Sequence, residues 1–494
     1  MFSIGGYQLN IPTLLLLLLQ CAALLHILFS KHGNPSQAGF WLLLVSLLPG
    51  AGLIAYALFG ITRFEYVRAK VAKLQREMLD VEAPYLKDAA RLYRELNKFQ
   101  LNGAGGSSAR MQTLDRLFPE NPALSGNHLE ILQDGVAVYP RMLEDMRKAK
   151  KCIRLQSFIL NNDAVGKEFM KVLHERAAAG VDVKVLVDSV GSFRNIISWT
   201  GPDKYNGKFS FRAFSPINIF APWKFQLRNH RKLLVVDGTI AYVGGVNIHA
   251  ENERLKQIPP SRYIHDLHCR ITGPAVTQLN LSFMTDYIYT SSRNRRQIKF
   301  DSGDCVTPEA AGDAVVRVLP SGPGNLREGT RKLFFAAAAL AERELWIITP
   351  YFVPGRDYVD ALCMAAARGV DVKLVLPAAN NHFFVDCAAR NFYEQLLSSG
   401  VKIYEKLGYF SHSKALLVDS QWGFMGSSNC DSRSFYLNFE LDFCFEKSEF
   451  VLDMIRQFQQ EIVGSRKLTM FRLSKTPRWR RLLNSIAALF TPIL

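Results

Sequence analysis

Two short stretches with the same chemistry occur far apart in this sequence. Each reads His-x-Lys-x-x-x-x-Asp, and each is followed at the same distance by a turn of small residues and an asparagine. The first set is His230, Lys232, Asp237 and Asn247, and the second set is His412, Lys414, Asp419 and Asn429. A lone histidine beside a predicted strand is usually structural, whereas a doubled pattern at matched spacing indicates a shared function.

These residue types suit the cleavage of a phosphodiester. The reaction needs a nucleophile, positive charge on the non-bridging oxygens, and an acid for the leaving alkoxide. Imidazole has a reference pKa of about 6.5, so near neutral pH one histidine can attack while the other carries a proton. The lysines can supply positive charge and the asparagines amide donors, so we expect catalysis with no metal ion and no other cofactor.

The chain around the two sets is an internal repeat. Strand-like runs and helical segments recur in the same order, in the paired segments 152–159 and 345–352, 165–179 and 357–368, 180–188 and 369–377, 209–214 and 401–404, and 233–236 and 416–418. Buried Gly-Val-x-Val runs bounded by helices favour parallel strands. The sequence therefore predicts a mixed α/β fold with an α/β/α sandwich in each half.

Neither half alone supplies two histidines, so we expect the halves to pack about a pseudo-twofold axis that brings both motifs to one site. Two independent copies with separate sites are the alternative. We also expect each motif to lie on a strand, where residues two apart, such as His230 and Lys232, share one face.

The N-terminal region holds two apolar stretches, Ile11–Phe29 and Phe40–Phe59, each about as long as a membrane-spanning helix requires. Pro49-Gly50 breaks the second stretch. A cleaved signal peptide is the alternative for the first stretch, but no basic segment precedes it and a second apolar stretch follows at once. Five basic residues follow the second stretch, namely Arg63, Arg68, Lys70, Lys73 and Arg76. Because basic loops remain in the cytoplasm, we predict a two-helix hairpin with both ends there.

The C-terminal segment is basic and then apolar. Its large apolar side chains fall near one helical face and are Trp479, Leu482, Leu483, Ile486, Leu489 and Phe490. Such a helix can pack on the protein's own core or lie on a membrane surface. The predicted division of the chain is a hairpin over 1–65, a helical connector over 66–108, a first half over 109–305, a second half over 306–465 and the C-terminal segment over 466–494.

Composition sets further limits. The chain has 494 residues and a net charge of +16, which indicates a polyanionic partner, either nucleic acid or an anionic membrane. The apolar hairpin favours the membrane, and no nucleic-acid-reading motif is apparent. The 8 cysteines lack Cys-x-x-Cys spacing, so we expect reduced thiols and no bound metal.

The doubled pattern resembles the paired signature of the phospholipase D superfamily, and its surroundings resemble the membrane-bound bacterial cardiolipin synthases. The matching segments are Arg228–Lys232, Arg262-Tyr263 with Asp266 and His268, Gly273-Pro274, Thr349–Phe352, Asp431–Phe435 and Asn438–Glu440. This resemblance implies two phospholipase-D-like halves at a bacterial inner membrane. It also implies the transfer of a phosphatidyl group between two phosphatidylglycerols, giving cardiolipin and glycerol.

The resemblance further implies roles for individual residues. His230 is expected to attack and form a phosphatidyl-histidine, while His412 acts as acid and base. Asp266 and Glu440 resemble the carboxylates that orient the two imidazoles. Asp237 and Asp419 are expected to matter more for structure than for catalysis.

Other residues near the two motifs are further candidates. His265 departs from the family pattern, in which an arginine or a similar residue precedes Asp266, and this leaves the acceptor open. His268 lies close enough to Asp266 to take part. Ser427 and Ser434 could act as nucleophiles, but no Gly-x-Ser-x-Gly elbow surrounds them. The remaining histidines are interpreted as structural or surface residues, and they are His26, His128, His174, His249 and His382.

Three alternative functions stay open. A phospholipase D that hydrolyses lipids would use the same residues, with water in place of the acceptor alcohol. A membrane-tethered nuclease of the superfamily is disfavoured by the hairpin, and an inactive scaffold is disfavoured by two intact motifs. The expected partners are phosphatidylglycerol and anionic membrane lipids, and a homo-oligomer remains open.

Overall fold

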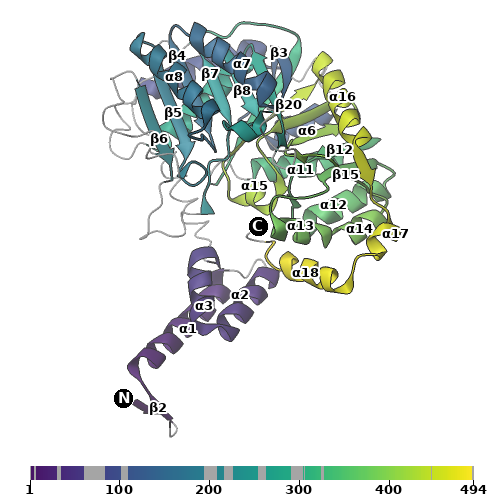
Figure 1. The fold of residues 1–494 in the computed structure, drawn as a ribbon. Helices are drawn as coiled ribbons and strands as arrows, with labels where there is room; N and C mark the ends of the chain where they lie inside the picture. The colour runs from purple at the N-terminus through teal and green to yellow at the C-terminus, as the bar shows by residue number, and fades with distance from the viewer. Residues whose placement is uncertain are drawn as a thin grey trace.

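The computed structural model describes residues 2–4, 7–30, 35–60, 84–101, 109–193, 209–215, 226–253, 263–290, 304, 306–323, 328–446 and 448–491. Most of the chain forms one α/β body, and apolar N-terminal helices project from it (Figure 1). The basic residues Arg63 to Arg76 lie outside the described residues, as does the 102–108 loop.

One 15-stranded sheet runs through the body, with its two halves side by side. From the centre outwards, the first half contributes β3 (Leu124–Gln133), β10 (Leu267–Thr272), β8 (Ile240–Gly244), β7 (Leu233–Val236), β4 (Cys152–Ser157), β5 (Asp182–Asp188) and β6 (Phe209–Phe214). The second half contributes β11 (Ala314–Ser321), β20 (Glu440–Glu446), β18 (Trp422–Gly426), β17 (Ala415–Val418), β12 (Glu344–Ile348), β14 (Asp371–Pro377) and β15 (Lys402–Lys406), with β21 (Ser465–Lys467) at the edge.

The two halves have the same strand order, so each strand except the edge strand β21 has a counterpart in the other half. The strands β4, β5 and β6 are parallel, as are β12, β14 and β15, which is the arrangement that the Gly-Val-x-Val runs predict. The halves meet where β3 pairs antiparallel with β11. The two predicted sandwiches are therefore joined through one continuous sheet.

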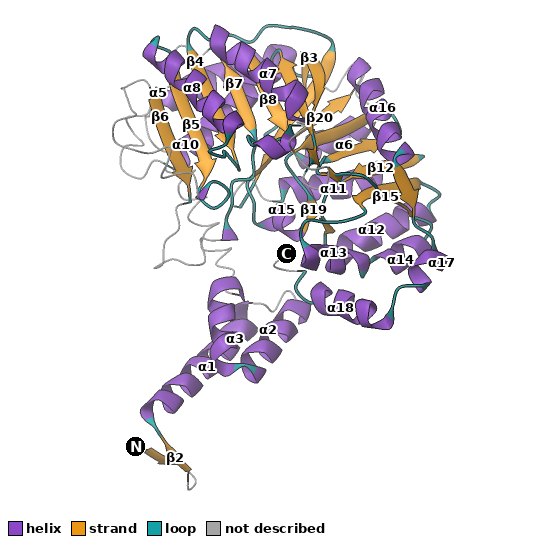
Figure 2. Ribbon diagram, in the orientation of Figure 1, coloured by secondary structure: helices purple, strands orange, loops and turns teal. Residues whose placement is uncertain are grey.

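Helices cover both faces of this sheet (Figure 2). In the first half, α7 (Asp134–Lys148) and α8 (Ala164–Ala178) pack on a core of β4, β5 and β7 side chains. In the second half, α11 (Gly329–Leu340) and α12 (Arg356–Ala367) pack on the equivalent core of β12, β14 and β17 side chains. On the opposite face, α10 (Ala275–Tyr289) and α16 (Glu449–Val463) share a third core with strands of both halves. That shared core ties the halves together, because burying apolar side chains stabilises the contact.

The N-terminal helices are α1 (Ile11–Ser30), α2 (Pro35–Leu47) and α3 (Pro49–Ala55), followed by a short π-helix over Tyr56–Gly60. Among the described residues, α1 is the one helix that is long and apolar enough to cross a membrane. The second apolar stretch is broken at Leu48, next to the Pro49-Gly50 pair that interrupts it in the sequence. The reason is Pro49, which has no backbone N–H to continue a helix from the preceding turn.

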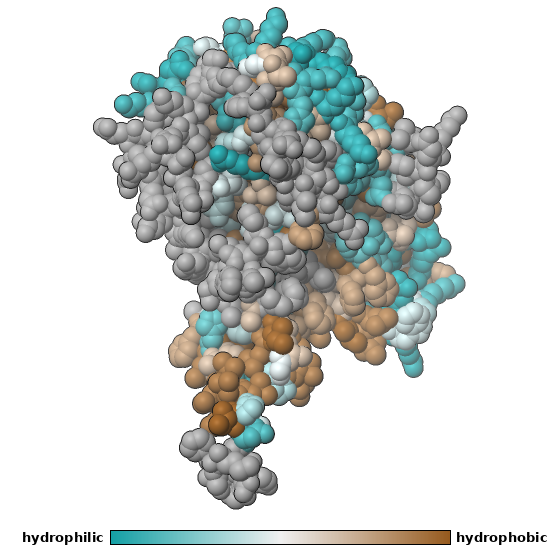
Figure 3. Space-filling model, turned by 60° about the vertical axis from the view of Figure 1, so that its left-hand side comes forward, coloured by the Kyte–Doolittle hydropathy of each residue, from teal (hydrophilic) through white to brown (hydrophobic). Residues whose placement is uncertain are grey.

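At the C-terminus, α17 (Met470–Ser474) and α18 (Arg478–Ala488) lie against the second half. The helix α18 packs on α13 (Phe383–Arg390) and buries Asn484 and Ala487. Its other face leaves apolar side chains exposed, namely Trp479, Leu482, Ile486 and Leu489. The ring of Phe490 contacts Phe40 of α2, so this exposed face lies close to the N-terminal helices. In Figure 3 the apolar surface of the N-terminal helices lies beneath the body.

Candidate active site

The two motif histidines lie in one pocket between the halves. His230 and His412 both line a pocket of about 580 Å³, together with Asn247 and Asn429. Both histidines come just before a strand, His230 ahead of β7 and His412 ahead of β17. The structure thus brings the two motifs together, although we expected the histidines to lie within the strands.

The backbone explains why these residues are outside the strands. Instead of pairing with its own half, the His230 N–H donates to the Phe439 carbonyl of the second half at 2.9 Å. In the same way, the His412 N–H donates to the His265 carbonyl of the first half at 2.7 Å. Each histidine is therefore positioned by the opposite half.

The carboxylates that contact the two imidazoles are also exchanged between the halves. His230 Nδ1 lies 3.0 Å from Glu440 Oε2, at the start of β20. His412 Nδ1 lies 2.7 Å from Asp266 Oδ2, just before β10. A carboxylate at Nδ1 fixes the ring orientation and leaves Nε2 for chemistry. Both sequence-predicted carboxylates therefore contact the predicted imidazoles.

Glu440 is held by an unusually large number of donors. Ser427 and Ser434 donate to its two oxygens at 2.5 and 2.8 Å, and Asn438 donates at 3.1 Å. Burial raises the pKa of Glu440, but the charge and the hydrogen bond of His230, the charge of Lys232 and the Ser427 hydroxyl outweigh burial and lower this pKa to about 2. The two serines considered as nucleophiles are thus donors to this carboxylate.

The corresponding carboxylate of the other half has fewer side-chain donors. Asp266 accepts from the Leu267 N–H at 2.9 Å as well as contacting His412. Burial opposes its charge, but Lys414 and His412 together lower the pKa of Asp266. Gly245 stands where the second half has Ser427, and a Cβ at Gly245 would lie 2.1 Å from Asp266 Oδ1. Only glycine leaves room for this carboxylate.

Both motif lysines are buried beneath the histidines. Lys232 Nζ donates to the His230 carbonyl at 2.6 Å, and Lys414 Nζ lies 2.8 Å from His412 Nδ1 and 3.7 Å from Asp266. Burial lowers the pKa of Lys232 to about 7 and that of Lys414 to about 8, although nearby carboxylates oppose this. Their charge is therefore costly until an anion arrives.

Burial favours the neutral form of both motif histidines. Burial lowers the pKa of His230, and it lowers that of His412 to about 3 with the help of Lys414. His268 is also buried and neutral, since burial lowers its pKa to about 3. Neither ring nitrogen of His268 has a partner among the described residues.

The two asparagines differ in how they are held. Asn247 Oδ1 accepts from the Ile159 N–H at 3.2 Å. Asn429 Oδ1 is buried in the pocket wall and has no partner among the described residues. Both side chains line the pocket, where their amides can contact a phosphate oxygen.

Asp237 and Asp419 lie at the opposite ends of β7 and β17 from the histidines. Both adopt a left-handed backbone conformation, with φ of 52° and 53°. Asp237 accepts the N–H groups of Lys150, Lys151 and Cys152 at 2.8, 2.7 and 2.9 Å. Asp419 accepts those of Glu342, Arg343 and Glu344 in the same way. These aspartates therefore anchor the starts of β4 and β12.

Several pocket residues were missed by sequence reasoning. His249 and His382 line the pocket, although we interpreted them as structural or surface residues. The ring of Tyr351 contacts both His382 and His412, with centroids 5.5 and 6.0 Å apart. His249 could have been found, because it follows Asn247 by two residues, as Asp431 follows Asn429. No sequence signal marked His382, which reaches the pocket from the start of α13.

His265, the departure from the family pattern, forms a buried ion-pair bridge. Its Nδ1 lies 2.8 Å from Asp134 and its Nε2 3.0 Å from Glu461, a residue of the second half. Burial disfavours its charge, but these two carboxylates outweigh burial and raise the pKa of His265 to about 10. His265 therefore clamps the halves together beside Asp266.

The fold and the site define a two-motif protein of the phospholipase D type. Residues 142–257 and 335–462 match the family model described as "Cardiolipin synthase, PLD-like domain", and residues 18–60 match "Phospholipase_D-nuclease N-terminal". A solved structure of phosphatidylserine synthase from Haemophilus influenzae covers 78% of this chain with a TM-score of 0.60 and 17% identity, which supports the fold.

Relatives narrow the family. The chain is 30% identical to a cardiolipin synthase of Alkalihalophilus pseudofirmus, over 95% of this chain and 91% of that protein. It is also 30% identical to cardiolipin synthase 2 of Bacillus anthracis, over 95% of this chain and 89% of that protein. The chain belongs to the cardiolipin synthase family of the phospholipase D superfamily. Together with α1, this membership indicates a membrane-associated phosphatidyltransferase.

Proposed function

We propose that this protein joins two phosphatidylglycerol molecules into cardiolipin and glycerol through a phosphatidyl-histidine. One observation carries the proposal: two histidines from different halves line one pocket, each with its Nδ1 on a carboxylate of the opposite half. Such a pair can divide attack and proton transfer at a single phosphorus atom.

The surroundings of the two Nδ1 atoms support different roles for the histidines. His230 Nδ1 faces two acceptors, Glu440 and the Ser427 carbonyl, both at 3.0 Å. Its proton is therefore held on Nδ1, and the lone pair on Nε2 is ready to attack. His412 Nδ1 lies between an acceptor, Asp266, and a donor, Lys414. The His412 ring can therefore gain or lose a proton and still keep a hydrogen-bond partner at Nδ1, as a general acid and base requires.

In the first step, His230 Nε2 forms a bond to phosphorus and the bond from phosphorus to the glycerol oxygen breaks. The bound phosphodiester anion raises the pKa of the buried His412 ring, which takes up a proton. His412 then gives this proton to the glycerol oxygen, and free glycerol leaves. In the second step, His412 takes the proton from a headgroup hydroxyl of the second phosphatidylglycerol. The hydroxyl oxygen then bonds to phosphorus, the phosphorus–nitrogen bond breaks, and cardiolipin forms.

Lys232 and Lys414 stabilise the charge that develops on the phosphoryl oxygens. Their buried ammonium groups gain an anionic partner when the phosphodiester binds, and their lowered pKa values should rise again. Preorganised positive charge of this kind lowers the barrier because it needs no rearrangement during the reaction.

We infer that the two halves are related by a pseudo-twofold axis through this pocket. Their shared strand order and the exchange of carboxylates support this symmetry. We also infer that α1 and the α2–α3 segment form a membrane hairpin, with the catalytic body in the cytoplasm. The contacts of Ile27 on α1 with Trp41, Val45 and Tyr56 support the hairpin. A reporter fused at Leu494 should be cytoplasmic, and a periplasmic signal would contradict this orientation.

The exposed face of α18 would then rest on the same membrane. It combines apolar side chains with Arg478 and Arg481, which suits an anionic interface. Because α18 packs on α13, and α13 begins next to the pocket residue His382, this face would hold the pocket close to its lipids.

Mass spectrometry of products from purified protein and labelled phosphatidylglycerol tests the reaction. The proposal expects labelled cardiolipin and free glycerol in equal amounts. Phosphatidic acid as the main product would show that water is the acceptor, and the protein would then be a hydrolase. The absence of both products would remove the phosphatidyl-transfer proposal.

A further inference from the structure

The two halves line the pocket with matching residues near the histidines and with different residues farther out. Two positions before each histidine, the first half has Arg228 and the second has Phe410. Four positions after each asparagine, the first half has Glu251 and the second has Arg433. All four side chains line the pocket. The two halves thus contribute equivalent residues beside the histidines and different residues farther out. Such a pocket suits two lipid headgroups that bind in different places.

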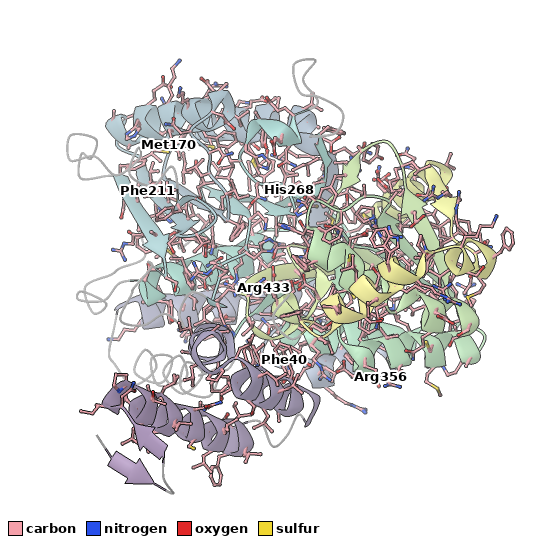
Figure 4. The ribbon with its side chains drawn as sticks, turned by 60° about the horizontal axis from the view of Figure 1, so that its bottom comes forward. Phe40, Met170, Phe211, His268, Arg356 and Arg433 are labelled. Atoms are coloured by element: carbon pink, nitrogen blue, oxygen red, sulfur yellow. The ribbon has the colours of Figure 1, made fainter. Side chains whose placement is uncertain are left out.

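The two arginines lie on the same wall, beside the strand-like contact between the halves. Arg433 donates to the Gln226 carbonyl at 3.0 Å, two residues from Arg228. The Phe439 N–H donates to the Arg228 carbonyl at 2.8 Å, and the Asn438 N–H donates to that of Arg433 at 2.9 Å. Figure 4 shows Arg433 at the junction of the two halves.

Arg433 differs from most of the arginines packed into the body. A carboxylate lies within 4 Å of six of them, namely Arg154, Arg228, Arg231, Arg270, Arg317 and Arg390. Among the described residues, Arg433 forms no ion pair and donates one hydrogen bond, to a carbonyl. Asp431 is a close neighbour, but its carboxylate is occupied by the Ser434 N–H at 2.7 Å. A guanidinium that is mostly buried without an ion pair favours an anionic ligand.

The proposed reaction provides such an anion. The donor's phosphodiester sits between the histidines and their lysines, whereas the acceptor carries a second phosphodiester at the other end of its glycerol headgroup. Both must occupy the pocket when the acceptor hydroxyl attacks. A pocket of about 580 Å³ is large enough for two headgroups. Guanidinium matches the two non-bridging oxygens of a phosphodiester in a bidentate fashion.

We propose that Arg433, supported by Arg228, binds the phosphodiester of the acceptor phosphatidylglycerol. This inference rests on the proposed transferase function. It adds that the two arginines make the enzyme prefer an anionic lipid as acceptor over water or a neutral alcohol. The arginines take no part in bond making, which remains with His230 and His412.

The test compares two reactions of the same full-length protein in mixed micelles. The first is cardiolipin formation from phosphatidylglycerol, which needs the acceptor's phosphate. The second is exchange of labelled free glycerol into phosphatidylglycerol, which uses the same donor step with an acceptor that has no phosphate. Arg433→Gln should lower cardiolipin formation by about 10- to 100-fold, the effect of losing a charge-assisted contact. Glycerol exchange should change less than about twofold.

Two further variants keep the test decisive. Arg433→Lys retains the charge without the bidentate contact, and it should show a smaller selective loss. Arg456→Gln removes an exposed arginine of the same half and should leave both reactions unchanged. If Arg433→Lys lost both reactions equally, or if Arg433→Gln kept both, the assignment would be overturned. A wild-type protein that exchanges glycerol but makes no cardiolipin would instead contradict the proposed function.

Discussion

The two halves of this protein carry the same reacting groups in different settings. Both supply a histidine, a lysine and an asparagine, yet His230 has a carboxylate held by three side-chain donors, while His412 shares its carboxylate with Lys414. The surroundings of His230 fix its tautomer, whereas those of His412 allow the ring to gain and lose a proton. Duplication therefore supplies the two groups that phosphoryl transfer needs, and the differences between the halves give them separate tasks.

The comparison also shows why neither half suffices alone. Each imidazole has its orienting carboxylate and its backbone acceptor in the opposite half. The equivalent acceptor positions are His265 and Phe439. His265 is a charged clamp between two carboxylates, whereas Phe439 packs against Phe214 and Tyr289. The same backbone contact is thus secured by charge on one side and by apolar packing on the other.

The largest expected effect is the loss of either histidine. His230→Ala and His412→Ala should each reduce cardiolipin formation by at least about 10³-fold. A phosphatidyl ester with a p-nitrophenol leaving group separates their roles, because this leaving group needs no acid. His412→Ala should still release p-nitrophenol and accumulate a phosphatidyl adduct on His230, detectable by mass spectrometry of peptides. An adduct on His412 in the His230→Ala protein would reverse the assignment.

The orienting carboxylates should rank next. Glu440→Gln and Asp266→Asn keep the side-chain shape but replace the acceptor that fixes each ring, which should lower kcat by about 10²-fold or more. The two variants should then differ. The p-nitrophenyl substrate should restore much of the rate to Asp266→Asn, which affects the acid, and little to Glu440→Gln, which affects the nucleophile. Equal rescue of both would mean that the two histidines are not specialised.

The lysines should give the pH profile its alkaline limb. Burial lowers the pKa of Lys232 to about 7 and that of Lys414 to about 8, so both lose positive charge as the pH rises through this range. We expect kcat/KM, which reports the free enzyme, to fall above about pH 7, by up to about tenfold per pH unit for each lysine that loses its charge. The limb in kcat should lie at higher pH, because bound phosphate stabilises the charged lysines. A kcat/KM that stays flat to pH 10 would contradict this role.

Sequence reasoning reached much of this arrangement and stopped at identifiable points. The sequence pattern placed β5, β6 and β7 at their observed positions, because buried strands form apolar or alternating runs bounded by turns. It missed β3 and β11, which join the halves, since β3 has a mixed burial pattern that resembles no simple period. The break at Pro49 was visible in the sequence, and α3 begins at this residue.

In the site, too, some residues could be predicted from the sequence and others could not. The doubled motif identified the histidines and lysines by spacing, whereas Asp266 and Glu440 were reached only through a family resemblance. Spacing could not reveal them, because each acts on the half to which it does not belong. His382 and Arg433 were not recognised as pocket residues for a related reason. Their relevance comes from tertiary packing at the junction, which no local pattern records.

The substitution His265→Phe gives the first half the residue that the second half has at the equivalent position, Phe439. It should have a smaller effect, on stability. The variant leaves Asp134 and Glu461 without their shared cation, which should cost about 3 kcal/mol of unfolding free energy. The folded pKa of about 10 lies above the reference value of about 6.5, so this stabilisation is complete below about pH 6.5 and is lost as the pH rises towards 10. The unfolding temperatures of the wild type and the His265→Phe protein should therefore differ at pH 6 and become similar near pH 10. A difference that grows with pH would contradict the charged clamp.

The smallest effect on activity should come from the aspartates that end each motif. Asp237→Asn and Asp419→Asn keep a residue that tolerates the left-handed turn, but each weakens hydrogen bonds to three backbone N–H groups. We expect a loss of about 1–2 kcal/mol in stability and less than about a twofold change in cardiolipin formation. Asp419→Asn should cost more, because Asp419 is fully buried and Asp237 is only half-buried. Activity lost without a change in unfolding temperature would instead place these aspartates in the chemistry, and the two ends of each motif would then act together.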